Sequence, residues 1–192
     1  MGLKYPVKVD RVNNLSDARY CAGMGVEIIG ISSEISVEEA MAITGWITGV
    51  EVCLDVYERT EHIMEYIENL KPTYVETNDV YIAQSIYRTP TKVIFRIEDS
   101  EYNPIQIVEQ LGTQVYAFNM TNRLLTAEQL MDISKKVNLI LNIDGYAIEQ
   151  VEEVCNHIKP MLLALSGGKE LAPGLKDFES MAEILEYLET ND

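Results

Sequence analysis

The sequence predicts a (βα)8 barrel, an α/β fold in which eight parallel strands alternate with helices. Short apolar runs alternate with longer amphipathic runs along all 192 residues, which is the pattern of repeated βα units. We count eight strand-like runs, and an even series of eight favours closure into a barrel. An open doubly wound sheet could hold the same units, but no glycine-rich nucleotide fingerprint follows the first strand.

The elements follow from these runs in order. Amphipathic segments with apolar residues at helical spacing predict helices, among them 16–24, 58–69, 126–136, 148–158 and 178–188, and Asp177 is the expected N-cap of the last. The predicted strands are the apolar runs 7–10, 27–32, 50–56, 74–77, 92–98, 115–120, 139–143 and 161–165.

Composition narrows the possible partners and location. A chain of 192 residues with 47% hydrophobic content can bury one core, so we expect a single domain over 1–192. The formal charge of −16 argues against nucleic acid or an anionic membrane surface as the main partner. The three cysteines are far apart and form no CxxC, which supports neither a disulfide framework nor a zinc site.

The chain shows no apolar signal region at its start and no run long enough to span a bilayer, so we expect a cytoplasmic protein. The sequence leaves the oligomeric state open.

Polar residues stand at the predicted carboxyl ends of the strands, where barrel enzymes carry their chemistry. Alternation along the first strand places Lys8 and Asp10 on one face, pointing into the barrel. The pair is either a structural ion pair or a base held by a cation. The acidic composition predicts a solvated rim for most of the others, which are Asp55, Glu76, Arg96, Glu98, Asn119, Asn142, Asp144 and Ser166.

The last predicted strand runs into Ser166, Gly167, Gly168 and Lys169 before a helix. Backbone N–H groups in such a turn can hold an anion, most often a phosphate, and Lys169 would add a positive charge. The alternative is an ordinary glycine turn with an exposed Lys169.

These segments resemble phosphoribosylanthranilate isomerase. Residues 7–12 (VKVDRV) and 14–18 (NLSDA) are similar to that family's opening, which reads roughly VKICGIT and then Leu-x-Asp-Ala. Residues 24–30 (MGVEIIG) and 36–40 (SVEEA) are similar to its next strand and helix start. The tail, 166–170 (SGGKE) and 173–177 (PGLKD), resembles the family's SSGVE and Pro-Gly-x-Lys-Asp.

The resemblance implies a cofactor-free Amadori rearrangement of a small phosphorylated aminosugar in tryptophan biosynthesis. The family's catalytic base falls on Asp10, beside Arg11, and its general acid falls on Asn119. Lys8, Arg11 and residues 166–169 become the candidate substrate-binding residues.

Three departures stand out. An amide at Asn119 cannot deliver a proton, so Asp144 or Asp55 would have to replace that acid. Asp144 also places a carboxylate where the family binds a phosphate, and like charges about 4 Å apart repel by several kcal/mol at a partly screened site. The loop at 32–36 lacks the family's arginine for the substrate's carboxylate.

Two alternative hypotheses about function follow from the resemblance and these departures. The chain is an isomerase of this type with Asp10 as base, or it is an altered barrel that binds a phosphorylated ligand or a protein without turnover. A magnesium or calcium site at Asp10, Asp55, Glu76 and Asp144 is a third possibility, which requires side chains of several strands to converge. We predict no metal site.

Overall fold

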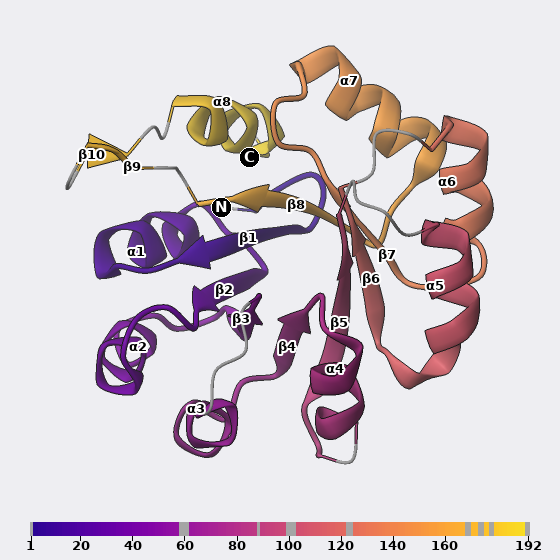
Figure 1. Ribbon diagram of the computed structural model, residues 1–192. Helices are drawn as coiled ribbons and strands as arrows, with labels where there is room; N and C mark the ends of the chain where they lie inside the picture. The colour runs from indigo at the N-terminus through magenta and orange to yellow at the C-terminus, as the bar shows by residue number, and fades with distance from the viewer. Residues whose placement is uncertain are drawn as a thin grey trace.

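The computed structural model confirms the barrel. It describes residues 2–57, 62–87, 89–98, 103–121, 125–167, 170–172, 175–176 and 179–190. Eight parallel strands close in the order β1 to β8, with β8 paired to β1 (Figure 1). Each lies within about two residues of its predicted position. Their bounds are β1 Val7–Val12, β2 Ile28–Ser32, β3 Glu51–Val56, β4 Tyr74–Thr77, β5 Lys92–Ile97, β6 Ala117–Met120, β7 Leu139–Asn142 and β8 Leu162–Ser166.

Helices surround the barrel on the outside (Figure 1). They are α1 Leu15–Gly23, α2 Val37–Thr44, α3 Ile63–Leu70, α4 Val80–Ile86, α5 Pro104–Leu111, α6 Ala127–Ser134, α7 Ile148–Glu153 and α8 Glu179–Leu188. A 3₁₀ turn, Gly112–Gln114, follows α5, a π-helical turn, Val154–Ile158, continues α7, and the short strands β9 Glu170–Ala172 and β10 Leu175–Lys176 precede α8.

The helix predictions are confirmed except at some ends. The predicted helix 58–69 begins at Ile63, and residues 58–61 and the predicted cap Asp177 lie outside the described residues. Ser36 and Thr126 begin α2 and α6 with reciprocal capping boxes, in which side chain and backbone satisfy each other's free N–H groups.

The two ends of the described chain meet. Lys4 N–H donates to the carbonyl of Leu188 over 2.7 Å, and Thr190 N–H donates to the carbonyl of Gly2 over 2.9 Å. These bonds attach the end of α8 to the segment that precedes β1. Among the described residues, no helix is long and apolar enough to cross a membrane.

Two apolar layers fill the fold. The larger packs outward-facing strand residues against the helices, and the smaller lies inside the barrel. Lys92 lies over the rings of Tyr74 and Tyr116, which are 5.3 Å apart, at the amino-terminal end of the barrel. The inner layer comprises Ile28, Cys53, Tyr74, Ile94, Ala117, Ile140, Leu162 and Ala164.

Gly30 in β2 leaves room for a charged side chain. A Cβ atom at this position would collide with the carboxylate of Asp55, which belongs to the neighbouring strand β3. The glycine is therefore required by a close approach, and the polar contents of the barrel depend on it.

We predict that Gly30→Ala destabilises the fold strongly, because the methyl group must displace a buried carboxylate from its partners. The loss should be at least about 3 kcal/mol, the range for disrupting a buried ion pair, as measured by urea unfolding. Gly23→Ala is the control, because nothing lies within 4 Å of its added methyl group, and it should not destabilise the fold. Equal effects of the two substitutions would contradict this reading of Gly30.

Candidate functional site

Six polar side chains from five strands converge in the carboxyl-terminal half of the barrel. None is more than 6% exposed. The predicted solvated rim is therefore wrong for Asp55, Glu76, Arg96 and Asn119, because closure of the barrel turns these positions toward its axis. Asn142 is buried as well, whereas Glu98 is half-buried. The cluster consists of Lys8 and Asp10 of β1, Asp55 of β3, Glu76 of β4, Arg96 of β5 and Asn119 of β6.

Lys8 lies at the centre of the cluster. Its ammonium contacts the carboxylate of Asp10 and lies 3.2 Å from Asp55 Oδ1 and 3.1 Å from Glu76 Oε2. Burial works to lower the pKa of Lys8, but the three carboxylates outweigh it and hold the pKa well above its ordinary value. Lys8 therefore stays protonated, and its ammonium is surrounded by three carboxylates.

Arg96 is the second cation and lies on the mouth side. Its Nη1 is 2.8 Å from Asp10 Oδ2 and 3.2 Å from Glu76 Oε1, and its Nε donates to Glu98 over 3.0 Å. Nη1 also lies 3.2 Å from the hydroxyl of Tyr57, which donates to Glu76 over 2.6 Å. Arg96 therefore covers Asp10 from the open end of the barrel.

Asn119, at the predicted general-acid position, donates its amide to other cluster members. Nδ2 lies 3.3 Å from Asp10 Oδ2 and 3.0 and 3.1 Å from the two oxygens of Glu76. Its Oδ1 is buried and has no hydrogen-bond partner within the described ranges of the chain. The neighbouring carboxylates accept the amide hydrogens, so Asn119 stabilises them by hydrogen bonding and does not supply a proton.

The charges do not balance. Three carboxylates face two cations, so the fully ionised cluster carries one excess negative charge. Burial and the nearby carboxylate of Glu76 raise the pKa of Asp10 to about 7, against the opposing effect of Lys8. Burial also disfavours the charged form of Glu76, but Lys8 and Arg96 overcome it and lower that pKa to about 2. Burial raises the pKa of Asp55 above its ordinary value as well, so Asp10 and Asp55 are the carboxyl groups of the cluster that favour a proton.

Arg11 connects the cluster to the rim. It adopts a left-handed conformation, with φ of 58°, which aims its backbone N–H at Asp55 Oδ2 over 2.7 Å. Its guanidinium lies over the ring of Tyr57, 4.6 Å from the centroid, and 3.8 Å from Glu98. The sequence prediction missed Tyr57, although alternation along the third strand places it on the same face as Asp55.

Asp144 and Ser166 bond to each other at the junction of β7 and β8. Asp144 accepts from Ser166 N–H over 2.9 Å and from its hydroxyl over 2.6 Å. Gly167 N–H donates to the carbonyl of Asp10 over 2.7 Å. The carboxylate of Asp144 therefore occupies the donors of Ser166, and a backbone carbonyl occupies that of Gly167. Gly168 and Lys169, the rest of the predicted phosphate turn, lie outside the described residues.

The acidic groups of the cluster could hold a cation. Oxygens of Asp10, Asp55 and Glu76 lie within 4.8 Å of one another, whereas Asp144, the fourth member of the predicted set, bonds to Ser166. Hard oxygen ligands of this kind suit magnesium or calcium. The ammonium of Lys8 lies among the same three carboxylates, so a metal ion would have to replace it.

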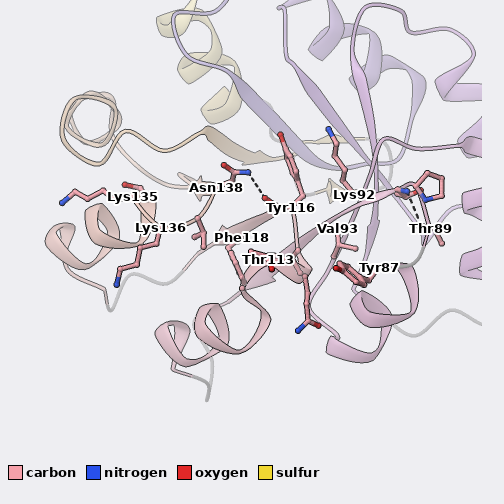
Figure 2. Close-up of a pocket in the computed structure, with 17 residues that line it drawn as sticks. Tyr87, Thr89, Lys92, Val93, Thr113, Tyr116, Phe118, Lys135, Lys136 and Asn138 are labelled. Carbon is pink, nitrogen blue, oxygen red and sulfur yellow. Dashed lines mark hydrogen bonds between the residues drawn. The ribbon is translucent and has the colours of Figure 1, made fainter.

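The cavity shown in Figure 2 lies at the other end of the barrel. It has a volume of about 730 Å³ and is bordered by the amino ends of β5, β6 and β7, where Asn138 donates to the carbonyl of Tyr116 over 2.9 Å. We do not assign the candidate functional site to this cavity despite its size, because none of the six cluster residues lines it. A cavity of about 530 Å³ lies beside the cluster itself and includes Tyr57 and Arg96 in its wall.

In (βα)8-barrel enzymes the active site lies at the carboxyl ends of the strands, which is where this chain carries its charged cluster. No protein-family model matches this chain, and neither does any curated protein sequence. Solved structures do match, and several of them are phosphoribosylanthranilate isomerases. The predicted resemblance is thereby confirmed at the level of the fold.

The enzyme from Thermotoga maritima aligns with a TM-score of 0.75 at 19% identity, covering 95% of this chain and 97% of that one. The Thermus thermophilus enzyme gives 0.74 at 20% identity, with 95% and 98% covered. A further phosphoribosylanthranilate isomerase, with a TM-score of 0.74 at 20% identity over 95% and 97% of the two chains, is in complex with reduced 1-(o-carboxyphenylamino)-1-deoxyribulose 5-phosphate.

We predict that Asp10 makes the fold less stable as pH rises from 5 to 7. With a raised pKa, folded Asp10 keeps a proton that the unfolded chain releases above about pH 4, so folding is favoured at the lower pH. Asp10→Asn should reduce the slope of unfolding free energy against pH by up to about 1.4 kcal/mol per unit, measured by urea unfolding at several pH values.

The matched control is Asp132→Asn, which removes an exposed carboxylate paired with Lys135 and should leave the slope unchanged. Identical slopes for the wild type and Asp10→Asn would show that Asp10 is ionised throughout this range.

Proposed function

We propose that this protein is an isomerase of the phosphoribosylanthranilate isomerase type, which moves protons on a small phosphorylated sugar-like substrate with Asp10 as its base. The observation that carries the proposal is the position of Asp10, at the carboxyl end of β1 inside the barrel, with a pKa raised to about 7. A base with this pKa suits proton abstraction at neutral pH. The activity would belong to tryptophan biosynthesis.

The two oxygens of Asp10 would have different roles. Lys8 holds Oδ1 from below, while Arg96 and Asn119 contact Oδ2. Lys8 would keep the carboxylate in place, and Oδ2 would take the proton from the sugar carbon once Arg96 moves aside. Proton transfer of this kind needs no cofactor.

The general acid must be a residue other than Asn119. Of the two candidates from the sequence, Asp55 is only 1% exposed and accepts from the backbone of Arg11. Asp144 is partly exposed at the mouth, so we assign it the role of proton donor to the ring oxygen. Ser166 to Lys169 remain the proposed phosphate turn, in which a bound phosphate would displace Asp144 from Ser166.

The second candidate is a barrel that binds a ligand or a protein without turnover. The pairing of Asp144 with Ser166 favours it, because a carboxylate there fills the donors that a phosphate would need. The amide at Asn119 favours it as well.

We predict that the purified protein consumes freshly generated phosphoribosylanthranilate, monitored by the loss of its fluorescence. Asp10→Ala should lower kcat/KM by about two to four orders of magnitude, the usual contribution of a general base. Glu128→Ala, at an exposed acidic residue in the first turn of α6, is the control and should be fully active. No turnover by a folded wild-type protein would reject the isomerase proposal.

The double substitution Asp10→Cys with Asn119→Asp distinguishes the two candidates. It restores the base and acid of the family while keeping the same number of carboxylates in the cluster. If the wild type is a binding barrel derived from this family, the double variant should gain turnover that neither single variant shows. If it stays inactive while folded, as judged by circular dichroism, the binding barrel is not simply an isomerase that lost these two groups.

A further inference from the structure

The amide of Asn119 leaves one buried acceptor in the charged cluster without a donor. Asn119 is completely buried, and its Nδ2 donates to Asp10 and Glu76. Its Oδ1 is buried too, but it accepts no hydrogen bond from any residue in the described part of the chain. An unpaired buried acceptor is costly, so this position favours a ligand that brings a hydrogen-bond donor.

The charge of Glu76 fixes which end of this amide is left over. Nδ2 lies 3.0 and 3.1 Å from the two oxygens of Glu76, and Lys8 and Arg96 lower the pKa of that carboxyl group to about 2, so it is ionised. Turning the amide over would place Oδ1 against this carboxylate, and two acceptors cannot bond to each other. The atom that remains for a ligand therefore accepts a hydrogen bond and cannot donate one.

The charge of the cluster favours a cationic donor over a neutral one. Its three carboxylates outweigh its two cations by one negative charge when all five are ionised. Cys53 and Tyr57 also face it, but burial raises the pKa of both, so they stay neutral. Arg11 and Glu98 at the rim carry opposite charges, 3.8 Å apart. One further positive charge would therefore balance the buried groups.

A protonated amine meets these conditions better than a metal ion. It brings a single charge and three N–H donors, whereas a divalent ion brings two charges. The carboxylates that could coordinate a metal already surround the ammonium of Lys8. Arg96 covers the cluster from the mouth and borders the cavity of about 530 Å³ beside it, so the movement of Arg96 that the isomerase proposal requires would also admit an amine.

We propose that the cluster binds the ammonium group of an amine ligand, which donates a hydrogen bond to Asn119 Oδ1 and balances the excess negative charge. The inference deepens the isomerase proposal and rests on it only in treating the ligand as a substrate, which would then carry a protonated amine. Binding itself requires no turnover.

The test is an NMR titration of the full-length protein with methylammonium chloride. We expect saturable shifts of the Asn119 side-chain amide signals, and no such shifts with methanol or sodium chloride at equal concentration. Asn119→Leu keeps the approximate shape of the side chain and removes the acceptor. It should raise the dissociation constant, followed through the backbone amides of β6, about tenfold or more, as expected for a hydrogen bond to a charged group.

Asn138→Leu is the matched control, because this exposed asparagine lies at the opposite end of the barrel and bonds only to the carbonyl of Tyr116 among the described residues. It should bind methylammonium as the wild type does. Equal effects of the two asparagine variants, equal binding of methanol, or no saturable binding of methylammonium would each overturn the proposal. The same shifts with magnesium chloride would also overturn it, in favour of a metal site.

The pH dependence of binding provides a second measurement, on the wild type alone. A proton on Asp10 competes with the ammonium for the same negative charge, and burial raises the pKa of Asp10 to about 7. The affinity for methylammonium, which stays protonated over this range, should therefore rise about tenfold from pH 6 to pH 8. An affinity that does not change with pH would contradict the proposal even if Asn119→Leu fails to fold. None of these readouts depends on isomerase turnover, so the two proposals can fail separately.

Discussion

The ammonium of Lys8 is the interaction on which the carboxyl-terminal half of the barrel depends. Three carboxylates from three strands converge on it, and each would be strongly destabilising without a cation nearby. The attraction within a buried ion pair offsets little more than the free energy lost when its charges leave water. The cluster is therefore weak evidence for a net gain in folding stability. It is better understood as a constraint, which fixes the distances between β1, β3 and β4 and requires a second cation, Arg96, on the mouth side.

Two local features of the backbone follow from this constraint. Gly30 has no side chain because the carboxylate of Asp55 occupies the space where one would lie. Arg11 takes a left-handed conformation, which costs a non-glycine residue about 1–2 kcal/mol, and its N–H thereby reaches the same carboxylate. The family that the sequence resembles has a glycine at that position, where the conformation carries no such cost. Here the side chain of Arg11 stacks on Tyr57 instead.

The sequence predicted the fold well because strand periodicity and βα alternation are local signals. It placed Lys8 and Asp10 on an inward face for the same reason. It could not distinguish buried from solvated carboxylates at Asp55 and Glu76, since an acidic chain places carboxylates at many loop ends and only closure of the barrel decides which of them meet. The pairing of Asp144 with Ser166 was equally hidden, because it joins the end of β8 to a turn after β7 whose geometry the sequence does not specify.

Arg96 connects the charged cluster with the cavity beside it. Its Nη1 contacts the oxygen through which Asp10 would take a proton, and the residue also borders the neighbouring cavity. A ligand that draws Arg96 toward the cavity removes a positive charge from Asp10, which favours the protonated carboxyl group. By linkage, protonation of Asp10 then favours the same movement of Arg96. Base strength and ligand binding are therefore coupled through one side chain, and a substitution at Arg96 would change both together.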